Sequence, residues 1–476
     1  MQIQIDFSLV YPHLFLLIWA ILVFLADFVT PEENKSRLGY MSLLGLVVTA
    51  ILSFNSNHGT TFWGAFTADK FSQSFNIIFI GSAILTILAS IDFVRERLKH
   101  QGEFYGLILF STVGMMFLAG ANDMLTLYVS LELATISLIV LAAYMKRDLK
   151  STEAGLKYLI IGAASSAILV YGMSLLYGLT GTLVLSEIGQ KVHAMFVDGP
   201  LFIIAVILIL AGLSFKLAAV PFHMWCPDVY EGAPTPVTAY LSVASKAAGV
   251  TALIRIFYQS LTMSASEWIP LILAIAAMAM VLGNVVAVRQ HNVKRLLAYS
   301  SIAQVGYLLT AFIAVSDRAV TSMILYLIVY MFANIGAFIV VITFYNRSGS
   351  DEITSYAGLS KRSPFLSISM VIFLLSLVGL PPTAGFIGKF CLFSAAIEKG
   401  YYWIVVLGVL TSVISLYYYM MIAYQMYFKT GDDQSKISVN MTLMVAIIIA
   451  LAGTLFIGVY PDPVISAITG ASQTFF

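Results

Sequence analysis

The stretch GLSFKLAAVPFHMWCPDVY, residues 212–230, places a lysine, a proline and a histidine inside an otherwise apolar segment. Pro221 follows Lys216 by five residues and lacks the backbone N–H that a helix would use at this point. A second segment, LVGLPPTAGFIGKF, residues 377–390, repeats the combination with a proline pair ahead of Lys389. Irregular backbone at membrane depth is tolerated only against protein or a water-filled cavity, so both segments indicate a site inside a helical membrane protein.

The composition indicates a polytopic membrane protein. Of 476 residues, 60% are hydrophobic and 10% are charged, whereas soluble chains carry about 25% charged residues. Apolar runs of about 20 residues favour helices over the short alternating strands of a barrel. The two cysteines, Cys226 and Cys391, lack metal-like spacing and are expected to be small buried apolar residues. The N-terminus has no basic region, so we expect the first apolar run to be a retained helix.

The apolar runs predict an all-α polytopic membrane protein with about fourteen transmembrane helices in a single domain, residues 1–476. No Gly/Ser linker, low-complexity tract or long hydrophilic stretch divides the chain. The predicted spans are 8–29, 38–54, 71–90, 103–120, 122–144, 154–180, 200–225, 235–259, 267–288, 293–314, 319–346, 364–398, 401–428 and 438–459.

The basic residues of the connections predict the orientation. Sixteen lysines and arginines fall on one side of the predicted membrane and four on the other, while five lie inside apolar segments. The positive-inside rule makes the first side cytoplasmic, so both termini are expected outside. The net charge of +1 argues neither for nor against nucleic acid, and we expect no nucleic-acid partner.

The seventh and twelfth predicted spans carry the helix breakers, and they lie five spans apart. An offset of five reverses the direction of a helix, so the chain is expected to contain two inverted five-helix repeats, roughly residues 103–259 and 267–428. Proline and glycine are also common in membrane helices without a special role. Two breaks, each beside a lysine, favour the functional interpretation.

One carboxylate, Glu132, and four lysines, Lys157, Lys216, Lys246 and Lys389, lie inside predicted spans. A charge near the bilayer centre costs at least about 2.5–3.5 kcal/mol, so such residues indicate a function. A cationic neighbour keeps a buried carboxylate ionised, and Lys216 or Lys246 is the expected partner. Burial disfavours the ammonium form of a lysine, which suits a proton relay. The alternative is a static salt bridge that locks helices together.

Three further residues accompany this set, and Lys157 within it has a second interpretation. His223 follows Lys216 by seven residues, two helical turns on if the helix resumes after Pro221, and suits a relay, although it can equally be a hydrogen-bonded packing residue. Lys157 begins the sixth span and either joins the relay or snorkels to the interface. Tyr299 adds a hydroxyl that can bridge waters. Arg255, near the outer end of its span, is expected to be an interfacial anchor.

Lys389 stands apart because its own span contains no deep carboxylate, and Glu398 lies near the outer end. The preceding pair Pro381–Pro382 leaves backbone carbonyls that water can reach. A buried lysine without a partner exchanges its proton easily, so we expect Lys389 to be a relay group.

Three segments resemble a known family. They are FHMWCPDVYEGAPTPVTAYLSVASKAAG (222–249), NVKRLLAYSSIAQVGY (292–307) and LPPTAGFIGKF (380–390). All three closely resemble subunit N of bacterial NADH:quinone oxidoreductase, respiratory complex I, in the family of antiporter-like membrane subunits. The resemblance covers essentially the whole chain, and PDVYEGAP is similar to the N type among the sister subunits.

The resemblance implies a proton-translocating membrane-arm subunit of an NADH:quinone oxidoreductase, driven by redox chemistry in partner subunits. It implies that the proton relay consists of Glu132, Lys157, Lys216, His223, Lys246, Tyr299 and Lys389. The chain has no flavin or nucleotide motif and no cysteine set for an iron–sulfur cluster, so we expect no cofactor in it. Flavin, iron–sulfur clusters and a quinone such as ubiquinone are expected in partner subunits. The expected location is the bacterial inner membrane, with both termini periplasmic and other membrane-arm subunits and lipid as neighbours.

Other interpretations share the sequence features. A subunit of a multi-chain sodium/proton antiporter would have the same fold without a redox partner. An inert scaffold that seals a membrane arm would use the buried charge pairs structurally. A stand-alone transporter of an organic solute fits less well, because the resemblance is so complete.

Overall fold

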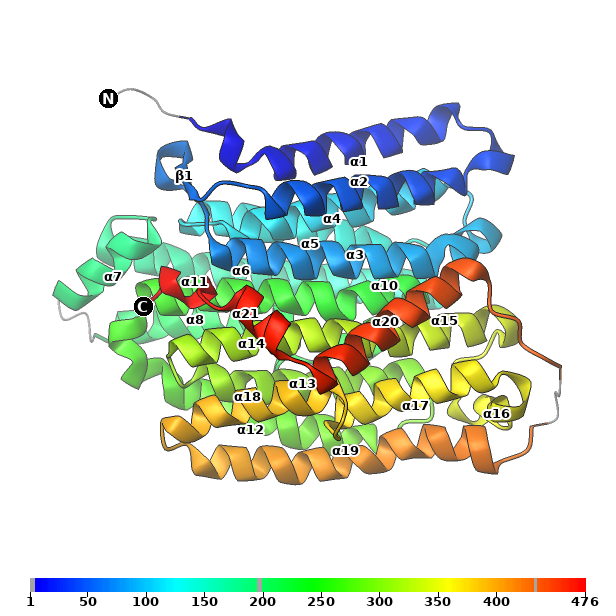
Figure 1. Cartoon of the computed structure of the whole chain (residues 1–476). Helices are drawn as coiled ribbons and strands as arrows, with labels where there is room; N and C mark the ends of the chain where they lie inside the picture. Colours follow the sequence, from blue (N-terminus) through cyan, green and yellow to red (C-terminus); the bar gives the residue numbers. More distant parts are fainter. Residues whose placement is uncertain (1–4, 195–198, 432–434) are drawn as a thin grey trace.

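The computed structural model describes residues 5–194, 199–431 and 435–476 as a bundle of helices that run side by side (Figure 1). The helices are α1 (Tyr11–Val29), α2 (Arg37–Phe54), α3 (Lys70–Arg97), α4 (Gln101–Ala119), α5 (Met124–Ala142), α6 (Leu149–Thr180), α7 (Leu185–Ala194), α8 (Pro200–Leu217), α9 (Trp225–Gly232), α10 (Thr235–Tyr240), α11 (Lys246–Ser260), α12 (Ala265–Ala287), α13 (Val293–Phe312), α14 (Asp317–Tyr330), α15 (Gly336–Ser348), α16 (Leu359–Arg362), α17 (Pro364–Val378), α18 (Ala384–Glu398), α19 (Tyr402–Phe428), α20 (Met441–Val459) and α21 (Asp462–Ile468).

Two short strands form the one sheet of the described residues. Strand β1 (Gly59–Thr61) pairs antiparallel with β2 (Phe66–Ala68), and Gly59 lies opposite Ala68. Short 3₁₀ turns occupy Phe7–Leu9, Glu32–Asn34, Phe62–Gly64, Thr262–Ser264, Ile353–Tyr356 and Ala471–Thr474.

The predicted spans coincide with helices. Among the described residues, twelve helices are long and apolar enough to cross a membrane, with α10–α11 and α14–α15 each acting as one. The other two predicted spans correspond to α13 and to the pair α17–α18. The prediction of an all-helical multi-pass membrane protein is therefore confirmed.

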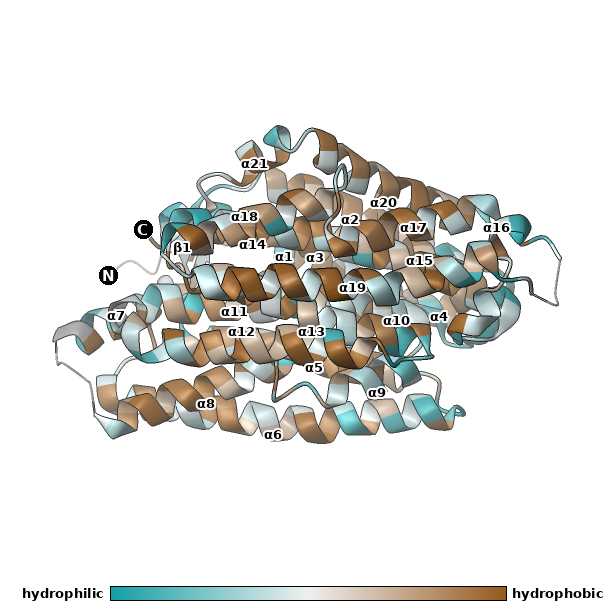
Figure 2. Ribbon diagram, turned by 90° about the horizontal axis from the view of Figure 1, so that it is seen from below, coloured by the Kyte–Doolittle hydropathy of each residue, from teal (hydrophilic) through white to brown (hydrophobic). Residues whose placement is uncertain are grey.

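Both ends of the bundle are polar. Helix α1 begins, and the segment after α21 ends, at the same end of the bundle, at the left of Figure 1. Hydrophobic residues fill the middle of the helices, whereas hydrophilic residues gather toward the ends, for example near α16 and α9 (Figure 2). This pattern fits helices that cross a layer of hydrocarbon and leave their connections in water.

Helix-capping residues define where the spans begin. The carboxylate of Asp69 accepts a hydrogen bond from Ser72 N at the start of α3, and Asp123 accepts one from Thr126 N at the start of α5. The amide oxygen of Asn292 accepts from two backbone N–H groups at the start of α13. Each cap satisfies N–H groups that have no partner inside the helix, so these polar residues fix the helix ends.

Two π-helical turns interrupt long spans deep in the bundle. One, Leu241–Ser245, joins α10 to α11, and the other, Met331–Ile335, joins α14 to α15. The side chain of Asn334 in the second turn donates a hydrogen bond of 2.6 Å to Ser242 Oγ in the first. Turns of this kind are rare and often lie at functional sites, and the first one ends immediately before Lys246.

Candidate functional site

Glu132 and Lys216 form an ion pair between α5 and α8 in which the lysine is buried and the carboxylate partly exposed. Lys216 Nζ lies 3.7 Å from Glu132 Oε1, and it donates a hydrogen bond of 2.8 Å to Thr135 Oγ1, one turn along α5. Ser166 of α6 donates a hydrogen bond of 2.5 Å to the same carboxylate. The Lys216 side chain is 2% exposed and that of Glu132 is 21% exposed. Of the two lysines expected as the partner of Glu132, the structure selects Lys216.

Lys246 begins α11 and lies on the neighbouring helix. A Cβ atom placed on Gly249, one turn on, would lie 2.8 Å from Leu217 Cδ2 and 3.5 Å from Lys216 Cβ. The absence of a side chain at Gly249 thus lets α11 approach α8 closely, as the short connection predicted. Lys246 is buried, and its Nζ has no hydrogen-bond partner among the described residues.

Lys216 and His223 do not share one helical face, because the helix that was required to resume after Pro221 does not do so before His223. Helix α8 ends at Leu217, because Ala218 takes a left-handed conformation with φ of 55°, and α9 starts only at Trp225. His223 therefore lies in the turn between two helices and not two turns along one helix. Its side chain is buried, and Nδ1 has no hydrogen-bond partner among the described residues.

Lys389 of α18 is held by neutral groups. Its Nζ donates to Val378 O at 2.9 Å and to Ser412 Oγ at 3.0 Å, and it lies 4.3 Å from the centre of the Tyr307 ring. No ion pair of Lys389 occurs among the described residues, and Glu398 pairs with an arginine at the far end of the helix. This agrees with the expectation of a buried lysine without a carboxylate partner.

A network of neutral side chains lies between Lys246 and Lys389. Tyr326 donates to Gln304 Oε1, Gln304 Nε2 donates to Leu377 O at 2.9 Å, and Tyr330 donates to Ser301 Oγ at 2.7 Å. The sequence reading missed these residues, because tyrosine, serine and glutamine are common and carry no charge. A usable signal was the four-residue spacing of Tyr326 and Tyr330, which places both hydroxyls on one face of α14.

Tyr299 lies outside this network. Its side chain is half-buried on α13, and its hydroxyl makes no hydrogen bond in the part of the chain that the structure describes. The adjacent Ser300 shares a hydrogen bond with the Tyr419 hydroxyl, and Gln304 lies one turn on. The polar face of α13 is therefore offset by one residue from the predicted one.

Lys157 belongs to an ionic cluster at the basic end of the bundle. Its Nζ lies 2.7 Å from Glu153 and 2.6 Å from Asp228, and its side chain is 40% exposed. Arg295 of α13 lies 2.9 Å from both Asp228 and Glu231 of α9. In the sequence, Arg295 was only one of the sixteen basic residues that predict the orientation. That it links α13 to α9 is visible only in the structure.

Two carboxylates of this cluster lie in the connection between the predicted spans 200–225 and 235–259. Partial burial opposes their ionisation, but the hydrogen bonds from Lys157 and Arg295 outweigh it and hold the pKa of Asp228 below its ordinary value. For Glu231, the hydrogen bonds from Lys150 and Arg295 likewise outweigh burial and lower the pKa. Both groups are therefore anionic at neutral pH.

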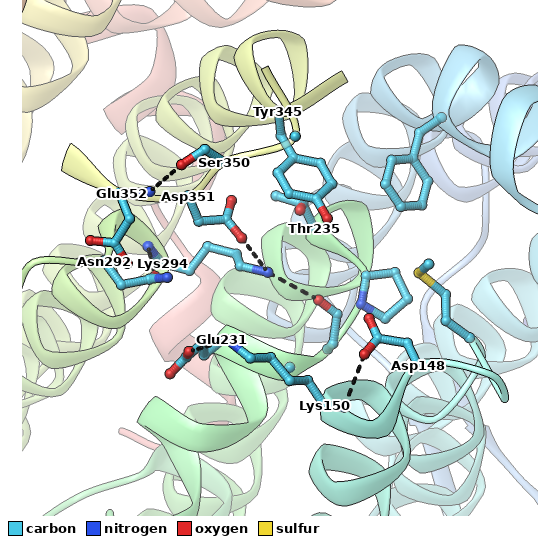
Figure 3. Close-up of a pocket in the computed structure, with 16 residues that line it drawn as sticks. Asp148, Lys150, Glu231, Thr235, Asn292, Lys294, Tyr345, Ser350, Asp351 and Glu352 are labelled. Carbon is cyan, nitrogen blue, oxygen red and sulfur yellow. Dashed lines mark hydrogen bonds and ion pairs between the residues drawn. The ribbon is translucent and has the colours of Figure 1, made fainter. Parts of the chain in front are cut away.

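A polar cavity of about 260 Å³ opens beside the cluster (Figure 3). Lys294 reaches across it to Asp351 at 3.1 Å, and Lys150 lies 3.0 Å from Glu231 at its edge. Residues of α6, α9, α10 and α13 line this cavity together with the segment after α15. Charged groups of both signs keep it accessible to water at the end of the bundle that carries most basic residues.

Arg255 is covered by the protein and anchors helices to one another. Its guanidinium is fully buried, donates to Asp69 at 2.8 and 3.0 Å and to Ala119 O at 2.7 and 3.0 Å, and lies over the rings of Phe71 and Phe475. Arg255 therefore joins α11 to the start of α3, the end of α4 and the C-terminal segment. The sequence placed it correctly near the end of its span, but the surrounding chain covers it.

No group of three or more His, Cys, Asp or Glu side chains that could hold a metal ion occurs among the described residues. Cys226 is buried as predicted, and Cys391 is half-buried; both are free thiols.

The fold and the buried lysines define an antiporter-like membrane protein. Residues 121–415 match the model of the NADH:quinone oxidoreductase/Mrp antiporter transmembrane family. The chain is 45% identical to NADH-quinone oxidoreductase subunit N of Moorella thermoacetica, over 94% of each chain. It is 40% identical to the subunit N of Desulforamulus reducens, over 99% of each. The chain therefore belongs to the NADH-quinone oxidoreductase subunit N family.

A solved structure supports this assignment. A chain of respiratory complex I from Thermus thermophilus superimposes with a TM-score of 0.82 at 32% identity, covering 96% of this chain and 99% of that one.

Proposed function

We propose that this chain is a proton-translocating membrane-arm subunit of an NADH:quinone oxidoreductase. Protons pass along Glu132, Lys216, Lys246 and Lys389, while Lys157, His223 and Tyr299 serve the access routes to this row. The observation that carries the proposal is the row of deep charged groups formed by the Glu132–Lys216 ion pair, Lys246 on the neighbouring helix and Lys389, with neutral hydrogen-bonded side chains between the last two.

The Glu132–Lys216 pair supplies the coupling. Two unit charges 3.7 Å apart interact by about 4 kcal/mol at an effective dielectric constant of about 20. A change in the charge of Glu132 therefore changes the energy of the Lys216 ammonium enough to favour proton transfer to or from it. Lys216 and Lys246 lie on neighbouring helices, so the same perturbation passes to the next lysine with weaker effect.

Glu132 also indicates where a partner subunit binds. Its side chain is 21% exposed in a groove between α5 and α6 that Tyr128, Ser166 and Tyr171 help to line. A carboxylate facing hydrocarbon at mid-helix would be costly, so another membrane-arm subunit covers this groove. Redox chemistry at flavin, iron–sulfur clusters and quinone in partner subunits reaches Glu132 through that contact as a change in local charge.

The architecture fits two inverted repeats, roughly residues 103–259 and 267–428. The interruptions at α8–α9 and α17–α18 occupy corresponding positions, each beside a buried lysine. With the basic end of the bundle cytoplasmic, both termini face the periplasm of a bacterial inner membrane.

The test compares proton movement with electron transfer in inside-out membranes that hold the assembled complex. Lys216→Ala and Lys246→Ala are expected to lower the number of protons moved per NADH oxidised, whereas Lys399→Ala, an exposed lysine at the end of α18, leaves it unchanged. Wild-type stoichiometry in both buried variants would refute the relay. A purified complex that lacks flavin, iron and NADH oxidation would instead favour a subunit of a sodium/proton antiporter.

A further inference from the structure

The proline pair after α17 frees two adjacent backbone carbonyls. In an α-helix the carbonyl of residue i accepts from the N–H of residue i+4. Leu377 O and Val378 O would thus require N–H groups at Pro381 and Pro382, and proline has none. Side chains donate hydrogen bonds to both carbonyls. The Gln304 amide donates to Leu377 O at 2.9 Å, and Lys389 Nζ donates to Val378 O at 2.9 Å.

The freed Leu377 carbonyl fixes the orientation of the Gln304 amide. A carbonyl can only accept, so the NH₂ end of the amide must face it and Oε1 must point the other way. Oε1 faces the Tyr326 hydroxyl, which therefore has to donate its proton to Gln304. The remaining lone pairs of the Tyr326 oxygen are left to accept from another donor. Gln304 is 3% exposed, so bulk water does not compete for these contacts.

The donor that Tyr326 faces lies on the side of Lys246. A cavity of about 10 Å³ is lined by Lys246, Ser301, Gln304, Tyr326 and Tyr330, among others. This volume accommodates about one water molecule, and a buried water needs two to four polar partners, which this lining provides. Lys246 Nζ is buried and has no hydrogen-bond partner among the described residues. The Lys246 ammonium group can therefore donate a hydrogen bond to a water in this cavity, and that water can donate to the Tyr326 oxygen on the other side.

We propose that Gln304 is a positioning residue for the step between Lys246 and Lys389. It sets the Tyr326 hydroxyl as an acceptor for one water bound at Lys246, and it ties that hydroxyl to the carbonyl pair that holds Lys389. The inference deepens the proposed proton relay and rests on it. In the step, one N–H bond of Lys246 breaks and one N–H bond of Lys389 forms, and the proton passes over water oxygens that each gain and lose one proton; the Tyr326 hydroxyl keeps its own proton and only orients the water at Lys246. The amide and the carbonyls carry no proton.

The experiment uses the assembled complex in membranes and three variants. Gln304→Leu removes the amide, and the coupled proton-translocation rate is expected to fall about tenfold, as for other lost orienting partners. Tyr326→Phe removes only the hydroxyl and is expected to have the same effect, so it decides the matter if Gln304→Leu does not assemble. Gln101→Leu, which replaces a buried amide on α4, is the matched control and retains the wild-type rate.

A pH profile separates positioning from packing. In Gln304→Glu the protonated carboxylic acid can donate to Leu377 O and accept from Tyr326, so activity is retained at low pH. The ionised form cannot donate to Leu377 O and attracts the ammonium groups of Lys246 and Lys389, so activity falls as the pH rises. The other titratable groups around this position are Tyr307, Tyr330 and Tyr419. A pH profile parallel to the wild type would overturn the proposal.

A high-resolution structure of the purified complex gives a readout that does not depend on pumping. It should show one ordered water between Lys246 Nζ and the Tyr326 oxygen, absent or displaced in Gln304→Leu. Lack of that water in the wild type would overturn the positioning role. So would wild-type pumping by assembled Gln304→Leu while Lys389→Ala is impaired. If Lys389→Ala also pumps normally, the relay itself fails, and this proposal fails with it.

Discussion

Replacement of Lys389 by arginine separates a relay group from a structural cation. Both side chains carry a positive charge, but the ordinary pKa of arginine exceeds that of lysine by at least about 2 units, which corresponds to about 3 kcal/mol. The deprotonated fraction therefore falls at least about 100-fold. The structure sharpens the contrast, because no carboxylate in the described part of the chain pairs with Lys389, and Val378 O and Ser412 Oγ accept from Nζ. With arginine at this position, a relay could not pass its proton on. If the lysine only anchors α18 by its charge, arginine would serve equally well.

The assay measures protons moved per NADH oxidised, together with the NADH oxidation rate, in inside-out membranes with assembled complex. Lys389→Arg is expected to lower the proton ratio, and Lys399→Arg, at the exposed end of the same helix, serves as the control. Five guanidinium donors face fewer acceptors than they need, so assembly is checked first by native electrophoresis. Assembled Lys389→Arg membranes with the wild-type ratio and rate would refute the relay role and leave a structural charge.

Three further outcomes are expected. A topology reporter fused after Asn34 reads cytoplasmic and one at the C-terminus reads external; a cytoplasmic C-terminus would contradict the orientation. Asp228→Asn loosens α9 by about 1 kcal/mol or less at pH 7, seen as faster amide hydrogen exchange. Because its folded-state pKa is held below the ordinary 3.8, the wild-type contribution is complete above that value and disappears as the pH falls below it, where variant and wild type should exchange alike. Gly385→Ala prevents assembly, since its Cβ would lie 1.7 Å from Ser376 O, whereas Gly178→Ala, with nothing within 4 Å, assembles normally.

The positions of the spans could be predicted because they depend on local properties. Hydropathy over about 20 residues fixes where a segment can cross a membrane, whatever it packs against. The same holds for the buried lysines, whose positions in apolar runs are visible in the sequence. The sequence also limited the partner of Glu132 to Lys216 or Lys246, and the structure selects Lys216.

Features that depend on a single backbone angle or on distant packing could not be predicted. Pro221 predicts a break in the helix. The helix already ends at Leu217, because Ala218 takes a left-handed conformation that an alanine rarely adopts. His223 consequently leaves the helical face expected for it. The burial of Arg255 could not be predicted either, because one of the side chains that cover it, Phe475, lies 220 positions away in the chain.

The network of neutral side chains between Lys246 and Lys389 could be predicted only in part. Counting four residues back from each proline identifies Leu377 O and Val378 O as free acceptors, so the sequence alone predicts two carbonyls in need of donors. It cannot name the donors, because Gln304 lies 73 positions away on another helix. A charged residue inside a membrane span is conspicuous because its burial is costly, but a neutral amide is not. Only packing distinguishes Gln304 from the other glutamines of the chain, by placing its two ends between a carbonyl that must accept and a hydroxyl that must donate.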